Sequence, residues 1–450
     1  MKSNQDIIDL IKRGHLPYIK VGVFDIDGVL RGKYVGHDKA ISALENGFGF
    51  CDVVLGWDIH DQLYDNAEFT GWHTGYPDVN VRLLSETFRR LPFEDSIPFV
   101  LGEFTDRAEA ICPRGLLRRV IEKANKMGFR ASAGCEFEFF VFDETPDTVR
   151  EKRYHNMKSI TPGNFGYSML RSGVHNAFHR KLLDTFRLTG IELEGLHTET
   201  GPGVIEAAIR VDDVLAAADK ASLFKTFTKI IAQQEGWMAT FMAKWSKDVP
   251  GQSGHIHLSL QDKDGNSAFY DPKSEHGISE TMRHFIGGQQ ALMPDLLSMY
   301  APTVNSFRRL VPGFWAPTVA TWGIENRTCA LRAILGGEKS HRVECRVPGA
   351  DINPYIAIAA ALASGLYGIA KKLEPDDPVN GNAYDQTFAN ERQLPHSLWD
   401  AADRFKHSFA ARGLFGDEFV DHYAATREWE VREFRKAITD WELERYFEII

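Results

Sequence analysis

The chain has 450 residues, of which 43% are hydrophobic and 25% charged, a composition typical of a soluble globular protein with one large or two smaller domains. The formal net charge of −10, without a block rich in Lys and Arg, argues against nucleic-acid binding as a main activity. The five cysteines are scattered without CxxC spacing, which predicts reduced thiols in a cytoplasmic protein rather than a disulfide framework.

The N-terminal region predicts a short helix followed by strands, and we assign residues 1–106 to a small first domain. The segment MKSNQDIIDLIKRG has an amphipathic helical pattern with acidic residues and no small-residue cleavage site, so we expect no signal peptide. In YIKVGVFDIDG, the DxDG at 25–28 resembles a phosphatase nucleophile loop, but the other parts of such an enzyme do not follow. We therefore predict a hairpin turn there.

Residues 107–450 form the second predicted domain, with mixed strands and helices. A helix is expected from Pro113 to Gly128, and helical patterns dominate from Ile352. No uninterrupted apolar run reaches membrane-spanning length, so we expect no membrane association. Strand runs followed by helix runs favour an α+β fold over a doubly wound sheet. Between the two helical regions we expect a strand in EFEFFVF, a polar loop over 143–166, a helix over 174–189, strands in IELEGLHTE and GVIEAAIR, a helix over 211–235, a strand in MATFMAKW and a hairpin in HIHLSLQDKDGNSAFYD.

Two carboxylates, Glu136 and Glu138, alternate with apolar residues in GCEFEFFVFD, so a strand would project both from one face. Like charges on a half-buried face are unfavourable unless a cation neutralises them. Carboxylates and imidazoles without a cysteine cluster suit Mg²⁺ or Mn²⁺. A polynuclear divalent-metal site is therefore predicted. Further residues of the same chemistry are Glu199, Glu206, His255, His257 and Glu344.

The segment 305–355 carries repeated arginines in apolar sequence shaped by Pro and Gly. Apolar strands seldom hold several Arg unless anions or carboxylates oppose them. Metal-binding acids together with an arginine array are typical of a phosphoryl-transfer site. No GxxxxGK[ST] loop is present, so a nucleotide would be held in another way. The arginines are Arg308, Arg309, Arg327, Arg332, Arg342 and Arg346.

Five segments, CEFEFF, SGHIHLSL, NSFRRLVPG, ENRTCALR and RVECRVPGADINPY, resemble the signature segments of the glutamine synthetase family. The resemblance covers 106–450, and more weakly the first hundred residues. It implies a small N-terminal β-grasp domain followed by a large catalytic domain with a curved antiparallel sheet and surrounding helices. It also implies a homo-oligomer of twelve subunits in two stacked hexameric rings, with active sites between subunits.

The resemblance implies two or three Mg²⁺ or Mn²⁺ ions per site. One would be held by Glu138, Glu199 and Glu206, and a second by Glu136, His255 and Glu344. ATP, as a substrate, would contact Glu194, His257, Arg332 and Lys339. Arg309 would contact the substrate carboxylate, and Arg327 and Arg346 would lie near the transferred phosphoryl group. Gly251 and Gly254 fall in the substrate-binding segment. In the implied reaction, ATP phosphorylates the γ-carboxylate of L-glutamate, and an amine then displaces phosphate.

The departures from the family pattern lie around the acceptor. Trp315, in GFWAP, stands where ammonia-using members carry a flap glutamate, and an indole offers an apolar and π surface but no base. The segment VPGQSGHIH is one residue shorter than usual and lacks the Asn that contacts glutamate. The N-terminal segment lacks an FDGSS-like motif, so Asp52 or Asp58 would serve as the base, with Trp57 as an added aromatic.

We therefore predict an ATP-dependent glutamate–amine ligase that makes a γ-glutamyl amide from L-glutamate and an organic primary amine, alkyl or aryl. Two alternatives stay open. One is a glutamine synthetase that uses ammonia. The other is a non-catalytic relative that kept only the fold, and the intact acidic and arginine positions count against it, because unneeded buried charges are costly. The identity of the amine stays open.

Overall fold

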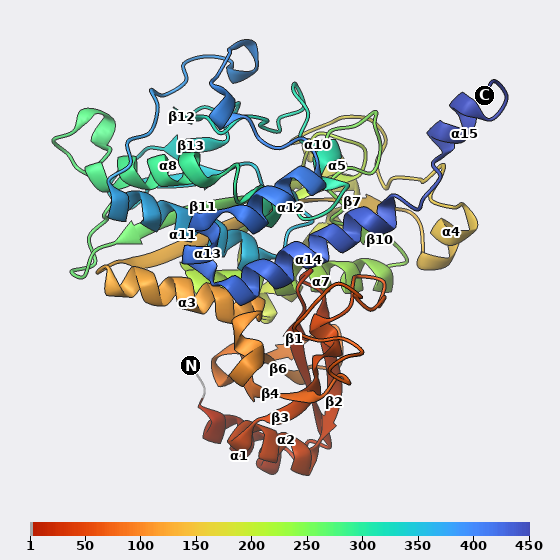
Figure 1. Cartoon of the computed structure of the whole chain (residues 1–450). Helices are drawn as coiled ribbons and strands as arrows, with labels where there is room; N and C mark the ends of the chain where they lie inside the picture. Colours follow the sequence, from red (N-terminus) through yellow and green to blue (C-terminus); the bar gives the residue numbers. More distant parts are fainter. Residues whose placement is uncertain (1–2) are drawn as a thin grey trace.

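The computed structural model describes residues 3–450, which form two β-sheets surrounded by helices (Figure 1). The first sheet has the strand order β2-β1-β6-β4-β3, with β5 paired to β6. Within it β1 and β6 are parallel and the other pairs antiparallel. Its strands are β1 (Tyr18–Phe24), β2 (Leu30–Gly36), β3 (Phe48–Cys51), β4 (Asp78–Leu83), β5 (Arg89–Leu91) and β6 (Ile97–Phe104).

Two helices, α1 (Asn4–Arg13) and α2 (His37–Asn46), accompany the first sheet. A capping box at Ser3 begins α1, and its apolar side chains are buried, as the amphipathic pattern predicts. The first two residues of that predicted helix, Met1 and Lys2, lie outside the described residues. The expected small N-terminal β-domain is confirmed.

The DxDG segment forms the turn between β1 and β2. The Oδ1 atom of Asp25 accepts hydrogen bonds from the backbone N–H groups of Asp27 and Val29, and Gly28 takes a φ of +77°. Arg31 holds the second oxygen of Asp25 at 2.8 Å. The carboxylates of this loop are therefore occupied by structural contacts, and the predicted hairpin turn is confirmed.

The second sheet has the strand order β12-β13-β14-β11-β7-β9-β8, with β10 paired to β7. The pair β12–β13 is parallel and the other pairs are antiparallel. The longest strand, β7, lies between β11 and β9 near the middle of the sheet. The strands are β7 (Arg130–Phe142), β8 (Leu193–Thr198), β9 (Val204–Asp213), β10 (Met238–Thr240), β11 (Gly254–Gln261), β12 (Trp322–Ile324), β13 (Leu331–Ile334) and β14 (Arg342–Cys345).

Helices cover this sheet and supply most of the C-terminal third of the chain, so the α+β expectation is confirmed. They are α3 (Pro113–Lys126), α4 (Pro146–Glu151), α5 (Met169–Val174), α6 (Asn176–Leu188), α7 (Val214–Gln234), α8 (Glu280–Leu292), α9 (Leu297–Tyr300), α10 (Ser306–Arg309), α11 (Pro354–Lys371), α12 (Leu398–His407), α13 (Phe409–Phe415), α14 (Asp417–Phe434) and α15 (Asp440–Tyr446).

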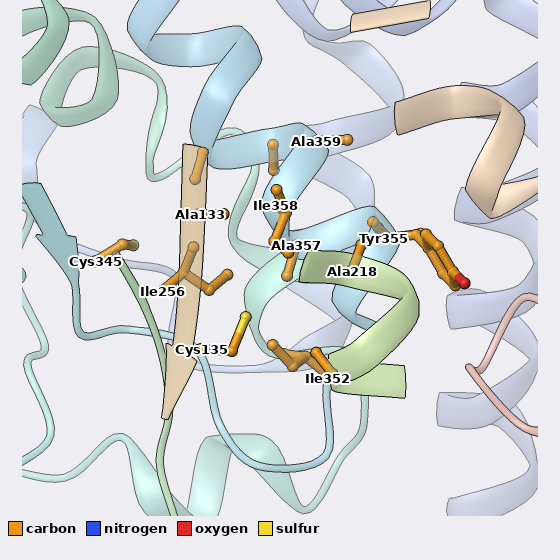
Figure 2. Packing of buried hydrophobic residues seen from close by; sticks show 14 of the residues in the cluster. Ala133, Cys135, Ala218, Ile256, Cys345, Ile352, Tyr355, Ala357, Ile358 and Ala359 are labelled. Atoms are coloured by element: carbon orange, nitrogen blue, oxygen red, sulfur yellow. The ribbon is translucent and has the colours of Figure 1, made fainter. Parts of the chain in front are cut away.

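The main core forms where α11 crosses the second sheet. Figure 2 shows Ile358 of this helix on the side of Cys135 of β7 and Ile256 of β11, and Tyr355 on the side of Ala218, all buried. Within residues 3–450, α11 is the one helix long and apolar enough to cross a membrane, which corrects the expectation that no stretch reaches that length. Since 78% of it is buried inside the protein, α11 reads as the central core helix.

Four local expectations differ from the structure. The predicted polar loop over 143–166 contains α4, a single short helix begun by a capping box at Thr145. The strand expected in MATFMAKW is limited to β10, and the hairpin after β11 closes with one bridge, Gln261 to Ser267, rather than a second strand. The helix expected from 211 begins at Val214, because β9 stays paired with β7 as far as Asp213.

Two hydrophobic clusters meet at the first sheet. One face of the sheet packs with α1 and α2, in a cluster that also holds Ile111 and Cys112. The opposite face contributes Phe24, Phe99 and Leu101 to the main core of the second sheet. Apolar contacts thus run past residue 106, and the division into 1–106 and 107–450 stays a prediction.

Candidate active site

The alternation of β7 places Glu136 and Glu138 on one face of the second sheet. Phe137 and Phe139, between and beside them, are fully buried in the core on the other face. Burial of these rings determines which face of β7 points into the core. A shift of the strand by one residue would put the carboxylates in the core and the rings in the site. The strand that the sequence predicted thus directs both carboxylates to the same side.

Strand register brings four of the remaining five acids and imidazoles to this pair, and the fifth, Glu199, directly follows β8. His255 of β11 stands opposite Glu136, and Glu206 of β9 stands opposite Glu138. On the next strand pair, His257 is opposite Glu344 of β14. The cluster is therefore built on four neighbouring strands, whose backbone hydrogen bonds hold it more firmly than loops would.

The first group consists of Glu136, His255 and Glu344, whose candidate ligand atoms lie within 4.8 Å of one another. The Nδ1 atom of His255 is 3.3 Å from Glu344 and 3.7 Å from Glu136. Burial alone would raise the pKa of Glu344, but His255 and the nearby Arg346 lower it to about 2. The pKa of Glu136 is likewise well below its usual range despite burial, because His255 and His257 adjoin it. Both carboxylates of this group therefore have cationic or hydrogen-bonding neighbours.

The second group consists of Glu138, Glu199 and Glu206, again within 4.8 Å of one another. Here the neighbours are mostly acids. Burial, followed by repulsion from Glu138 and other carboxylates, raises the pKa of Glu206 to about 9. Burial also raises the pKa of Glu138, which the backbone N–H of Ser253, at 2.7 Å, and the more distant Arg309 offset in part. This group has an excess of negative charge.

Both groups fit a hard divalent cation. Their donor atoms are carboxylate oxygens and imidazole nitrogens, which suit Mg²⁺ or Mn²⁺. Within residues 3–450, the Nε2 atom of His255 is buried without a hydrogen-bond partner, an arrangement that is costly unless another ligand satisfies it. The two sets correspond residue for residue to the two ligand sets expected from the sequence.

A cavity of about 410 Å³ opens on one side of Glu136. Three of the four residues expected to contact ATP line it, namely Glu194, His257 and Lys339. The fourth, Arg332, faces a neighbouring cavity, where its guanidinium donates to Glu344 at 3.1 Å. Glu136 lines both cavities, so it stands at their junction.

The second cavity, of about 530 Å³, collects most of the other predicted site residues. Its wall is formed by the two acidic groups, by arginines and by aromatic side chains. Of the predicted residues it is lined by Glu136, Glu138, Glu199, Glu206, Gly251, His255, Arg309, Trp315, Arg327, Arg332, Glu344 and Arg346.

Arg309 is buried at the edge of this cavity. Its guanidinium donates to the carbonyl oxygens of Val347, at 2.8 Å, and Arg346, at 3.2 Å. Burial lowers the pKa of Arg309 to about 10, which Glu138 counteracts, so the group stays cationic at neutral pH. A Cβ at Gly251 would lie 2.6 Å from the Cγ of Arg309, and glycine is therefore required for this close approach.

Arg346 and Arg327 differ in their surroundings. The Nη1 of Arg346 donates to Glu344 at 2.5 Å, and its Nε donates to the carbonyl oxygen of Arg327 at 3.1 Å. The side chain of Arg327 lines the cavity and, within residues 3–450, forms no ion pair. Arg346 is thus paired with an acidic residue, while the guanidinium of Arg327 is available to bind an anion in the cavity.

Three predicted residues lie away from the cavities. Gly254 is in β11, where a Cβ would come within 2.5 Å of the carbonyl oxygen of Gly349, so it permits close packing under the site. Asp52 is fully buried in the N-terminal region, where Thr70 and Arg107 bind its carboxylate. Asp58 accepts a hydrogen bond of 3.1 Å from the indole of Trp429. The two aspartates line neither cavity of their own chain.

Two aromatic residues of the larger cavity were not predicted. Tyr167 stacks on His197 with ring centroids 4.3 Å apart and an interplanar angle of 8°. It follows a polar loop whose sequence carries no periodic signal, so nothing in the pattern points to it. Phe314 also lines the cavity, and its place beside Trp315 in GFWAP is a signal that could have identified it.

Comparisons with known proteins give relatives along the whole chain. The family described as glutamine synthetase, catalytic domain, matches residues 110–446. Type-1 glutamine synthetase 2 of Dictyostelium discoideum is 45% identical over 456 residues, which cover 100% of this chain and 87% of the relative. Glutamate–isopropylamine ligase of Pseudomonas sp is 39% identical over 446 residues, which cover 98% and 97%. The solved structure of apo GmaS without ligand has a TM-score of 0.85 at 25% identity and covers 99% of this chain and 100% of that one.

The family match spans most of the chain, and the solved structure reproduces both sheets in one fold. The expected glutamine synthetase-type architecture, an N-terminal β-domain with a curved catalytic sheet, is therefore confirmed. The family uses ATP and divalent metal ions, in agreement with the acid-rich cavity described above. The chain belongs to the glutamine synthetase family and is an ATP-dependent carbon–nitrogen ligase.

Proposed function

We propose that the protein is a glutamate–amine ligase that forms a γ-glutamyl amide from L-glutamate and an organic primary amine, alkyl or aryl. The observation that carries this proposal is the aromatic wall of Phe314 and Trp315 in the same cavity as the acidic groups and Arg327. Ammonia has no apolar surface to place against such a wall, whereas an alkyl or aryl group gains free energy by leaving water there. The name of the Pseudomonas relative supports an amine acceptor.

ATP is assigned to the cavity of about 410 Å³, with Glu194, His257 and Lys339 on its wall. Arg332, which faces the larger cavity, would reach the phosphates. The two acidic groups would hold Mg²⁺ or Mn²⁺, two or three ions per site, and such ions, when bound, would offset phosphate charge. In this assignment the terminal phosphate would point toward the cavity that holds the arginines.

Glutamate is assigned to the cavity of about 530 Å³. Arg309 would hold its α-carboxylate, and Gly251 keeps the backbone close to that arginine. In the first step a γ-carboxylate oxygen attacks the γ-phosphorus of ATP, ADP leaves, and the acyl phosphate forms. Arg327 and Arg346 would stabilise the charge on the transferred phosphoryl group. The carboxylate thereby acquires phosphate as a leaving group.

In the second step the neutral amine attacks the acyl carbon, phosphate leaves and the amide forms. The ammonium form must lose a proton first, which calls for a base near the acceptor. We assign this role to Asp52 or Asp58 of a neighbouring subunit, and favour Asp58, since the carboxylate of Asp52 is buried against Thr70 and Arg107. Neither residue can act on the cavity of its own chain, so this assignment requires an oligomer.

The oligomer we propose is two stacked hexameric rings, in the cytoplasm. The C-terminal segment supports association, because α15 projects from the body of the subunit (Figure 1) and three of the four residues after it are apolar and exposed. Phe447 and Ile449 are 84% and 82% exposed. An apolar segment of this kind is typical of a contact surface. Light scattering tests the assembly, and a fully active monomer would contradict it.

An assay of phosphate release tests which nucleophile the enzyme prefers. With ATP, Mg²⁺ and L-glutamate, the expected kcat/KM for isopropylamine, ethylamine or benzylamine exceeds that for ammonia by about tenfold or more. Mass spectrometry should identify the γ-glutamyl amide. The competing candidate is a glutamine synthetase, which the name of the Dictyostelium relative favours. Preference for ammonia over every primary amine in the panel would establish that alternative.

A further inference from the structure

The loop of residues 311–317 is held on both sides of Trp315 by side chains from distant parts of the chain. On one side, the ring of Phe314 lies over Lys244, with Nζ 4.4 Å from the ring centroid. On the other, Tyr384 donates a hydrogen bond of 3.4 Å to the carbonyl oxygen of Ala316. The two contacts are therefore made by the residues directly before and directly after Trp315.

Lys244 is itself firmly placed. Its side chain is buried, and its Nζ donates to the carbonyl oxygen of Val249. The side chain of Asn305 accepts from the backbone N–H of Lys244, at 2.9 Å, and donates to its carbonyl oxygen, at 2.7 Å. Within residues 3–450, the ammonium forms no ion pair within 4.0 Å of a carboxylate. Its electrostatic partners are that carbonyl, the π face of Phe314 and the more distant Asp248.

Tyr384 contacts the loop on the C-terminal side of Trp315. It lines a cavity of about 230 Å³ together with Pro312 and Pro317 of the loop and Phe388. Because the loop lies over a hollow here rather than over close-packed core, packing alone supports it weakly. The hydrogen bond from Tyr384 therefore supplies a fixed point on this side.

The backbone of the loop needs such support. Trp315 has a φ of +59° and Gly313 a φ of +83°. Glycine adopts this left-handed region readily, but for a bulky residue such as Trp it is an outlier that persists only where the surroundings hold it. Released from its neighbours, the backbone at Trp315 would relax to a negative φ and carry the indole away from the cavity wall.

We propose that Lys244 and Tyr384 are positioning residues that hold Trp315 in the acceptor cavity and thereby set the selectivity between organic amines and ammonia. The inference rests on the proposed ligase function, because it assigns selectivity to the same cavity. Neither residue lines the cavity of about 530 Å³, so both act through the loop rather than on the reacting atoms.

The test uses Lys244→Met, which keeps an apolar chain of similar length without the cation, and Tyr384→Phe, which removes only the hydroxyl. Lys244→Arg retains a cation over Phe314 and should restore wild-type behaviour. Lys247→Met and Tyr154→Phe change exposed residues of the same types and serve as controls. Tyr384→Phe keeps the proposal testable if Lys244→Met does not fold.

Two measurements are made on the full-length oligomer. The first is the ratio of kcat/KM for isopropylamine to that for ammonia, which should fall about fivefold in each variant while the KM for ATP is unchanged. The second is the rate of chymotrypsin cleavage after Phe314 and Trp315, followed by mass spectrometry, which should rise about tenfold as the loop opens more often. Cleavage does not depend on which nucleophile the enzyme uses.

The outcomes separate this proposal from the function on which it rests. The ratio can be measured whichever nucleophile the wild type prefers, so a preference for ammonia would overturn the ligase proposal alone. Wild-type cleavage in both variants would show that the loop is not held by these contacts and would overturn the inference. Faster cleavage with an unchanged ratio would overturn it too, because the contacts would then hold the loop without setting selectivity.

Discussion

Glu138 and Glu206 stand directly opposite each other in the antiparallel pair formed by β7 and β9. Like charges in this arrangement destabilise a sheet, and here both side chains are also removed from most of the solvent. Burial, and after it the repulsion from neighbouring carboxylates, raises the pKa of Glu206 to about 9. The protein thus retains an unfavourable pair in the sheet that its fold depends on, as expected where function requires it.

Replacing Glu206 with Gln should therefore stabilise the metal-free protein while abolishing turnover. We expect the free energy of unfolding after chelation to rise on the order of 1 kcal/mol or more, because the raised pKa makes Glu206 take up a proton on folding at neutral pH, whereas Gln folds without one. Mg²⁺ or Mn²⁺ should raise the Tm of the wild type and have a smaller effect on Glu206→Gln. Thermal unfolding with and without EDTA checks both. Glu275→Gln, at a 91% exposed position, is the control, and a less stable Glu206→Gln would contradict the assignment.

The two cavity arginines should respond differently to truncation. Arg327→Ala should lower kcat on the order of 10²-fold with little change in Tm, because its side chain has no ion-pair partner within residues 3–450. Arg346→Ala should lower kcat similarly and also destabilise the fold by about 3 kcal/mol, since the buried Glu344 loses a charged partner. Steady-state kinetics and denaturant unfolding measure the two effects. Arg308→Ala, an exposed neighbour of Arg309, is the control, and equal Tm losses in both variants would refute the distinction.

Trp315→Glu should narrow the preference for organic amines. Burial of a small hydrocarbon group against the indole is worth roughly 1–3 kcal/mol, and a carboxylate at this position removes that surface. It also offers a charge that favours ammonium. We expect kcat/KM for isopropylamine to fall by about tenfold or more, with an equal or higher value for ammonia. Trp399→Glu changes a tryptophan outside the cavity and is the control. A variant with unaltered selectivity would show that Trp315 does not contact the acceptor.

Acid should destabilise the protein through His422, a residue of α14 that lines neither cavity of the active site. Burial lowers the pKa of His422 from 6.5 to about 4, and its ring packs beside Phe69. Between these values the unfolded chain binds a proton that the folded protein does not, so stability falls as the pH drops from 6.5 toward 4.

His422→Phe should remove this dependence, which amounts to about 3 kcal/mol at most. Unfolding midpoints at pH 7.5 and 5.0 test it, with His407→Phe, at a 70% exposed position, as the control. If the variant loses as much stability as the wild type over this interval, another group is responsible.

Much of the catalytic site could be predicted because strand alternation is visible in sequence. The pattern around Glu136 and Glu138 gave the correct face of β7, and the family resemblance identified their partners, which the register of β11 and β9 brings together. A resemblance of this strength compensates for what periodicity cannot supply, namely which strands are neighbours. Periodicity also located most long helices, including α3.

The remaining parts depend on contacts that a linear pattern does not encode. Tyr167 reaches the cavity from a loop, and its stacking on His197 joins segments thirty residues apart. The positive φ of Trp315 has no signature in GFWAP. The helix α4 has six residues, which is too short for a periodic signal. Asp52 was a plausible base by sequence, but only the structure shows that Arg107 and Thr70 occupy it.

The distribution of side chains between strands and loops has a consequence for engineering. Most of the acidic residues and both imidazoles stand on paired strands, whereas Trp315, Phe314 and Tyr167 stand on loops. Loops accept replacement with little cost to folding. The preferred nucleophile could therefore be changed through these loops while the strand residues of the metal and phosphate site stay the same. Grafting the 311–317 segment from one relative to another, together with the residues at positions 244 and 384 that contact it, should transfer the preference for the acceptor.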